Sequence, residues 1–265
     1  MSRIFNGSTD RIDWDNIFNP VGSNQTVSAW VNLDTIPSSF RYIWVAHNAA
    51  NNGVATIFYF QYVDATHLQV TLESTGSTSM VRRTANTYLL ANYTGGWHHF
   101  LYTWDGSTTA ANAHIYIDGA VDDTSETNGV TLTAATGKWS IGGRIYDDAR
   151  NLDGKIAEIA VWNVIVDGAT IADLADGADA YTCYPENLQF YADLLGANLT
   201  DPVSETTGTA DGTTESADHP TINDCGVSIS VSPSTSPSCL AASGWISTSG
   251  SRWSSRIHGS WRFSV

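Results

Sequence analysis

Hydrophobic and polar residues alternate in short runs through the first 196 residues of the chain. A two-residue period puts alternate side chains on opposite faces, so each run predicts a β-strand. Leu68, Val70 and Leu72 show the pattern most clearly, because polar residues separate them. Strands are predicted at residues 26–33, 42–48, 56–63, 67–74, 97–104, 114–119, 138–143, 154–163 and 187–196. Gly, Asn, Asp and Ser fill the gaps, which indicates an antiparallel sandwich or barrel.

One segment, residues 167–177, has the period of a helix instead. Asp167 is a suitable N-cap, Ile171 and Leu174 have i, i+3 spacing, and Gly177 can end the helix. The chain is therefore expected to be all-β with one short helix.

Two adjacent histidines in residues 97–104 raise the question of a metal or acid–base site. Neighbouring side chains of a strand point to opposite faces, so His98 and His99 cannot chelate one ion together. Apolar residues on both faces predict a central strand of a two-layer fold. Asp118 and Gly119 form a two-residue hairpin turn signal.

The composition changes near residue 197 to Thr, Ser, Gly, Asp and Pro, so a domain boundary is placed there. Residues 1–196 are the sandwich, and residues 197–265 are a C-terminal arm with a strand expected at 226–238. The tip of the arm is basic and rich in tryptophan, with Trp245, Arg252, Trp253, Arg256, Trp261 and Arg262. Since residues 1–196 carry 9 basic and 21 acidic side chains, the arm is expected to dock on neighbouring copies.

The formal net charge of −15 excludes nucleic acid as the main partner, because phosphate binding needs a basic surface. It also argues against an anionic membrane. No apolar run reaches the roughly 18 residues of a membrane span, and no signal peptide is visible at the start. The three cysteines, Cys183, Cys225 and Cys239, do not form a disulfide-scaffold pattern. One pair within the C-terminal region and a fully reduced chain both remain open.

Three segments together resemble the laminin-G-like, or concanavalin A-like lectin/glucanase, jelly roll. They are "TVSAWVNLDTIP", the run "GWHHFLYTWDGS" with its following "AHIYIDG", and "IGGRIYDDARNLDGKIAEIAVWN" with the helix after it. The resemblance covers residues 1–196 and implies an antiparallel two-sheet jelly-roll sandwich. Residues 187–222 are similar to stretches that follow such domains in phage and environmental sequences.

Glycoside hydrolases of laminarinase type share this fold, and the resemblance implies a Glu-x-Asp-x-(x)-Glu array in them. The chain has six glutamates, and no two lie within five residues of each other. Gly-x-Ser-x-Gly, His-x-x-x-His and Cys-x-x-Cys patterns are also absent. The chain is therefore predicted not to be an enzyme, with Glu158 a structural strand residue and His219 a loop histidine.

The resemblance also leaves open a calcium ion bound by aspartates at the rim of the sandwich. The candidate groups are Asp10, Asp13 and Asp15; Asp118, Asp122 and Asp123; and Asp147, Asp148 and Asp153. None has a fixed ligand spacing, so no metal ligand is assigned. Aromatic side chains that can stack on a sugar, or else fill the core, are Tyr42, Trp44, Tyr59 and Tyr146.

The arm and the phage-like resemblance together predict a non-catalytic virion structural protein, either a capsid decoration or a fibre-associated subunit. It would form homo-oligomers, contact other virion proteins and adsorb to host glycans. The alternative is a secreted or surface carbohydrate-binding lectin-like module, and the third option is the remnant of a glycoside hydrolase. The expected locations are the virion for the first and the extracellular space for the second.

Overall fold

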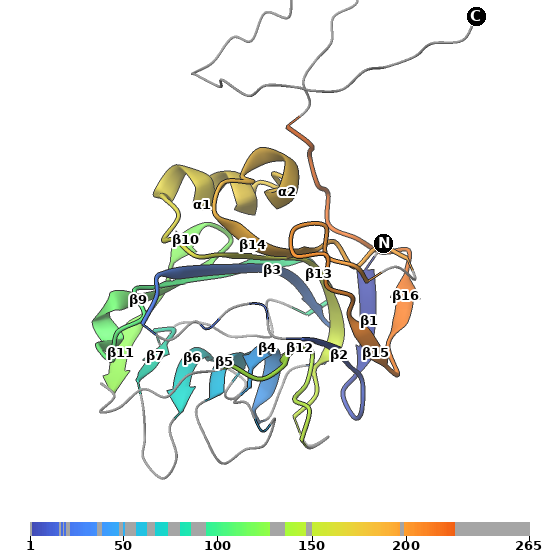
Figure 1. Cartoon of the computed structure of the whole chain (residues 1–265), viewed down its shortest axis with the longest axis horizontal. Coiled ribbons are helices and arrows are strands. Elements are labelled where there is room, and N and C mark those ends of the chain that lie inside the picture. The colour runs from blue at the N-terminus through green and yellow to red at the C-terminus, as the bar shows by residue number, and fades with distance from the viewer. Residues whose placement is uncertain are drawn as a thin grey trace, which may run out of the picture. The chain divides into compact units, whose positions relative to one another are not determined.

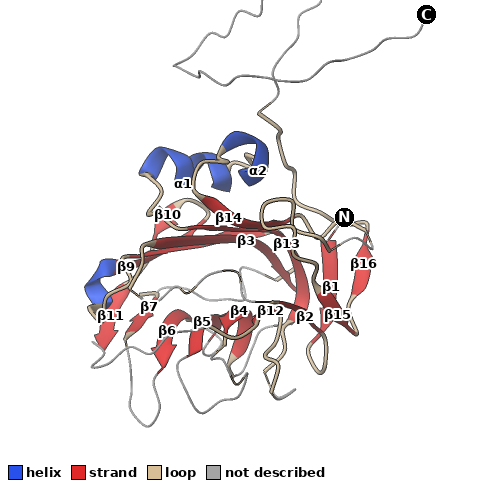
Figure 2. Cartoon of the chain, viewed as in Figure 1, coloured by secondary structure: helices blue, strands red, loops and turns tan. Residues whose placement is uncertain are grey.

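Two antiparallel β-sheets lie face to face in the computed structural model (Figures 1 and 2). The described residues are 2–15, 17, 19, 22–35, 39–47, 50, 57–62, 67–73, 80–85, 94–127, 136–146, 150–196 and 199–225. Within them, each sheet has eight strands. The predicted all-β jelly-roll sandwich is confirmed.

The first sheet, called sheet A, is built around the long central strands β3 and β13. In spatial order it contains β10 (Ala120–Val121), β9 (Ala113–Ile117), β8 (His98–Trp104), β3 (Gln25–Leu33), β13 (Asp153–Trp162), β1 (Ser2–Asn6) and β16 (Thr214–Ser216), with β14 (Leu188–Ala192) also paired to β13. The same edge of β13 therefore pairs first with β1 and then with β14.

The second sheet, sheet B, carries the remaining strands. In spatial order it contains β11 (Thr124–Thr127), β7 (Val81–Arg83), β6 (Leu68–Glu73), β5 (Ile57–Tyr62), β4 (Arg41–Ala46), β12 (Trp139–Ile141), β2 (Arg11–Trp14) and β15 (Thr209–Asp211). A short 3-10 helix, η2 (Ala110–Asn112), precedes β9.

The main core lies between the sheets, where the alternation of the sequence predicts it. Leu68 and Val70 are fully buried there, and Trp44 meets Trp139 edge to face with ring centroids 4.4 Å apart. A register shift in β4 between Tyr42 and Trp44 lets both Ile43 and Trp44 face this core, while Tyr42 faces outward.

The outer face of sheet A is covered by helices, a layer that the two-layer prediction lacks. The predicted helix is confirmed as α1 (Gly168–Ala175), with Asp167 accepting a hydrogen bond from the Thr170 amide. A second helix, α2 (Ala180–Cys183), follows it (Figure 2). Ile171 and Leu174 of α1 pack on Leu101 of β8, so that strand is buried on both faces.

The segment after residue 196 continues the sandwich. The strand β15 pairs with β2 at the edge of sheet B, and β16 pairs with β1 at the edge of sheet A. The compact unit accordingly extends past the predicted boundary to Gly226. Two short strands thus lie in the segment predicted as the C-terminal arm. The predicted strand at 226–238 and all six predicted arm residues lie outside the described part of the chain, so the arm's docking stays a prediction.

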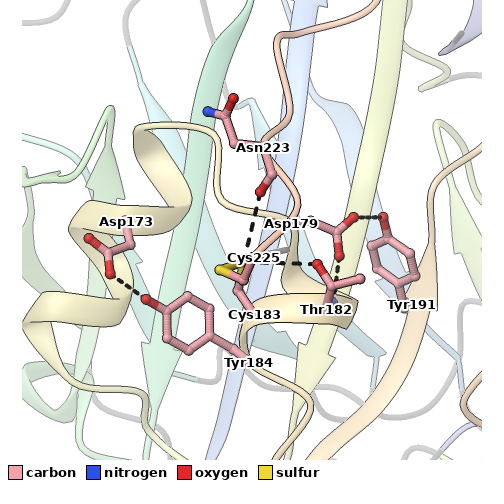
Figure 3. The surroundings of a disulfide bond; sticks show 8 residues. All are labelled: Asp173, Asp179, Thr182, Cys183, Tyr184, Tyr191, Asn223 and Cys225. Carbon is pink, nitrogen blue, oxygen red and sulfur yellow. Dashed lines mark hydrogen bonds between the residues drawn. A yellow bond between two sulfur atoms is a disulfide. The ribbon is translucent and has the colours of Figure 1, made fainter. Parts of the chain in front are cut away.

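A disulfide joins Cys183 at the end of α2 to Cys225 (Figure 3). Neither alternative left open by the sequence matches this pairing, because Cys183 belongs to the sandwich. A parallel bridge between Ala178 and Asn223 brings the two segments together, and the Cα atoms of the cysteines lie 5.0 Å apart. No helix in the described ranges has the length and apolarity needed to cross a membrane.

Candidate functional site

A cleft of about 590 Å³ opens on the helix side of sheet A. Its floor is formed by Glu158 of β13 and Tyr191 of β14, and α2 with the residue before it supplies one wall. The opposite wall is the segment 219–224, which precedes the disulfide. The cleft therefore combines parts of the chain that lie far apart in the sequence.

A β-bulge places Glu158 in this cleft. The register of β13 against β3 shifts between Ala157 and Ala160, and Glu158 has a φ of +53°. The bulge lies where the pairing of β13 with β1 ends and its pairing with β14 begins. Bulges re-aim a side chain in this way, and they recur next to functional sites. The prediction of a purely structural strand residue misses this orientation.

The carboxyl groups of Glu158 and Asp179 both contact the hydroxyl of Tyr191. The contact between that hydroxyl and Asp179 Oδ2 is 2.9 Å long, and the other is a short hydrogen bond to Glu158 Oε2. On its other side, Glu158 Oε1 lies 3.0 Å from Nε2 of His219. The Nδ1 atom of His219 donates to the Pro220 carbonyl, which can only accept. Four side chains thus form one continuous chain of contacts.

This chain requires a proton on a carboxyl group. The Tyr191 hydroxyl has one hydrogen and can donate to only one of its two carboxyl neighbours, so the other contact needs a carboxylic acid as donor. Burial raises the pKa of Glu158, although the hydrogen bonds from His219 and Tyr191 oppose this. Burial therefore favours the protonated form of Glu158. Burial, followed by the charges of the two carboxylates, raises the pKa of Tyr191 strongly.

An aromatic platform forms the side of the cleft. The ring of Tyr181 stacks on Tyr191 with centroids 5.7 Å apart and an angle of 12° between the planes. Tyr181 is 42% exposed and Leu195, also in the cleft, is 38% exposed. Across the described ranges, these are two of four large apolar side chains with such exposure. Their meeting in one concave site is typical of a ligand-binding surface.

The same geometry does not suit glycoside hydrolysis. A hydrolase needs a scissile bond between its two carboxyl groups, with room for the sugar. Here the Tyr191 hydroxyl occupies the space between Glu158 and Asp179. Asp179 is also the N-cap of α2, and its carboxyl group accepts a hydrogen bond from the Thr182 amide at 2.6 Å. The arrangement favours binding over bond cleavage.

The aromatic residues predicted to stack on a sugar lie elsewhere. Trp44 is in the main core, and Tyr42 is buried on the outer face of sheet B, where its hydroxyl accepts from Arg144 and Arg150. Tyr146 packs beside Tyr42. The side chain of Tyr59 lies outside the described part of the structure. Neither Tyr42 nor Trp44 offers a ring face to solvent.

Among the residues that the structure describes, the candidate calcium groups do not converge on a metal site. Asp13 accepts from Ser140 and Asp123 from Arg82, so protein donors occupy these carboxylates. Asp10, Asp118, Asp122 and Asp153 likewise accept from neighbouring protein groups, Asp15 is paired with Lys138, and Asp147 and Asp148 lie outside the described residues. In the ranges that the structure covers, no group of three or more His, Cys, Asp or Glu side chains is placed to hold a metal ion.

The paired histidines separate as strand geometry predicts. His98 is partly exposed, and its Nδ1 lies 2.8 Å from Asp118 Oδ2. His99 is fully buried under the helices, with Nε2 2.8 Å from Ser28 Oγ. Burial lowers the pKa of His99 to about 4, which keeps its ring neutral at physiological pH. These histidines therefore support the fold.

Comparison with known proteins identifies the architecture. Residues 6–172 match the family model Laminin_G_3, described as the concanavalin A-like lectin/glucanases superfamily. A candidate carbohydrate-binding protein of Bacteroides ovatus has 23% sequence identity and a TM-score of 0.56, and the match covers 81% of this chain and 59% of that protein. A heptameric SAP-like pentraxin of Limulus polyphemus has 15% identity and a TM-score of 0.51, with 80% and 93% covered. A comparison with curated proteins gives no match.

Proposed function

Because the chain belongs to the concanavalin A-like lectin/glucanases superfamily, we propose that it is a non-catalytic, lectin-like module that binds a neutral saccharide in the helix-side cleft. The observation that carries the proposal is the exposed Tyr181 ring, held parallel to Tyr191 above buried carboxyl groups. Aromatic faces pack against the apolar faces of sugar rings, and neighbouring oxygens accept hydrogen bonds from sugar hydroxyls. The B. ovatus protein, named for carbohydrate binding, supports this at the level of fold.

The charge of the cleft sets the class of saccharide. The cleft contains the carboxyl groups of Glu158, Asp179, Asp193 and Asp224, while no Lys or Arg is among the described residues that line it. A sialic acid, a uronic acid or a sulfated sugar brings a negative charge that no Lys or Arg in the described lining neutralises. A sugar that presents only hydroxyl groups finds acceptors and an aromatic face. Neutral glycans are therefore the expected ligands.

The disulfide bears on where such a module works. Disulfides persist in secreted proteins and on cell and virion surfaces, and they are rare in a reducing cytosol. The Cys183–Cys225 bond therefore supports an extracellular or surface location. It is compatible with the virion role predicted from the C-terminal arm, which stays a prediction. Mass spectrometry of purified particles tests that role, since a structural subunit must be found in them.

Binding to a glycan array of neutral and acidic saccharides, with calcium and with a chelator, tests the proposed function directly. The strongest ligand is then titrated calorimetrically into the wild type and the Tyr181→Ala variant. Loss of the stacking face should weaken binding roughly tenfold. The Ile165→Ala variant is the matched control, because Ile165 is an exposed apolar side chain outside the cleft. Its affinity should equal that of the wild type.

Three results contradict the proposal in different ways. If only acidic glycans bind, the class of ligand is wrong. If a neutral glycan binds with the same affinity to wild type and Tyr181→Ala, the saccharide site lies elsewhere on the sandwich. If no saccharide binds at all, the lectin function itself is wrong.

A further inference from the structure

One wall of the cleft is a segment with few contacts, residues 219–225, here called the strap. Its first residue, His219, contacts Glu158, and its last, Cys225, forms the disulfide with Cys183. The match to the family model ends at residue 172, and α2 and the strap follow it in the sequence.

Few non-covalent contacts hold the far end of the strap. The Asn223 amide donates to the Gly177 carbonyl at 2.7 Å, and the Asp179 amide donates to the Asn223 carbonyl at 3.1 Å. Thr221, Asn223, Asp224 and Cys225 are all exposed. No strap residue belongs to a hydrophobic core cluster of the described chain. Exposed backbone hydrogen bonds open easily where little apolar surface is buried with them, as in residues 221–225, which follow the buried Pro220.

We propose that the Cys183–Cys225 disulfide is the clamp that closes this wall, so that reducing it opens the cleft and weakens ligand binding while the sandwich stays folded. Cys183 is the last residue of α2, which carries the Tyr181 platform, and Cys225 ends the opposite wall (Figure 3). One covalent bond thus fixes the two walls relative to each other. The ligand part of this inference rests on the proposed function; the opening of the strap does not.

The reducing step is thiol–disulfide exchange with an external dithiol. A thiolate of the dithiol attacks one protein sulfur and forms a mixed disulfide, which releases the other protein sulfur as a thiolate. The second thiol of the reagent then attacks the reagent sulfur of the mixed disulfide and releases the remaining protein sulfur as a thiolate. The reagent becomes a cyclic disulfide, and the protein gains two electrons and two protons as two thiols. Cys225 is exposed, so the reagent reaches the bond without unfolding the protein.

Hydrogen–deuterium exchange of the full chain, with and without dithiothreitol, tests the clamp. We expect the amides of Asn223 and Asp179, which make the two backbone hydrogen bonds between the strap and the rest of the cleft, to exchange at least roughly tenfold faster after reduction, while β3 and β13 stay the slower-exchanging part of the chain. The Cys183→Ser/Cys225→Ser double variant should show the same fast exchange without reductant. The Cys239→Ser variant is the matched control, since it removes the third cysteine and keeps the disulfide.

The outcomes separate the clamp from the function. Unchanged exchange at Asn223 and Asp179 after complete reduction, verified by thiol counting, overturns the clamp, and so does exchange of β3 and β13 at the rate of an unfolded chain. Faster exchange limited to the strap supports it even if no saccharide binds to the oxidised protein. Where a saccharide does bind, its affinity should fall at least roughly tenfold on reduction, and an unchanged affinity overturns the link between the clamp and the site.

Discussion

The buried ring of His99 should make the stability of the protein depend on pH, and His99→Gln is the perturbation that isolates this effect. In the folded chain, Nε2 of His99 contacts Ser28, and Nδ1 is buried without a hydrogen-bond partner in the described part of the structure. A second proton on this ring would bury both a charge and an unsatisfied N–H group. Glutamine keeps a polar atom near Ser28 and removes the titration.

The size of the effect follows from the shift. The pKa of His99 falls from 6.5 to about 4, mainly because of burial, so the unfolded chain binds more protons than the folded chain between these values. The contribution of the neutral His99 ring to stability is therefore fully present above pH 6.5, and it is lost as the pH falls toward 4. The loss reaches about 2 kcal/mol at pH 5 and about 3 kcal/mol when the folded ring titrates.

Urea unfolding followed by tryptophan fluorescence gives the free energy of unfolding at pH 8, 7, 6 and 5. The drop between pH 8 and pH 5 should be about 2 kcal/mol smaller in His99→Gln than in the wild type. A second histidine provides an independent check: burial lowers the pKa of His47 to about 3, and His47 belongs with sheet B. His47→Gln should reduce the drop by a similar amount, and the two effects should add. If His99→Gln loses as much stability between pH 8 and pH 5 as the wild type does, the His99 ring of the wild type does not titrate as the burial argument requires.

Two other changes probe the covalent and steric limits of the fold. Replacing Cys183 and Cys225 by serine should lower the free energy of unfolding in urea by about 4 kcal/mol, because the bond restricts the unfolded chain over a separation of 42 residues. A loss below about 1 kcal/mol contradicts this entropic origin of the stabilisation. Gly142→Ala should cost about 3 kcal/mol in the same assay, because its Cβ would lie 2.2 Å from Phe5 Cδ1 at a φ of +76°. Gly168→Ala, where the added Cβ meets nothing within 4 Å, should be close to neutral.

Much of the sandwich is predictable because local pattern and burial agree. The alternation around Leu68 and Val70 and the N-cap at Asp167 reappear as strand and helix. The covering helix layer is harder to foresee, since it depends on which face of β8 meets α1. Disulfide pairing also depends on the fold, because the bridge between Ala178 and Asn223 brings the cysteines together across 42 residues.

The candidate site escapes sequence reasoning for a similar reason. Its members come from β13, α2, β14 and the strap, and no spacing along the chain reveals that they meet. One local signal does exist. Ile156 and Ile159 both face the main core although they are three residues apart, which an unbroken strand does not allow. The break in parity marks the bulge at Glu158, where a side chain leaves the regular pattern.

The pairing of the first strand has a consequence for how the chain folds during synthesis. β1 pairs only with residues 153–156 and 214–216 among its neighbours in sheet A, so its partners leave the ribosome long after it does. Contacts this distant in sequence make folding slow. Until β13 and β16 emerge, the nascent chain exposes unpaired strand edges that can associate with other chains. Production of soluble protein should therefore depend on slow translation or on chaperones that shield the N-terminal half.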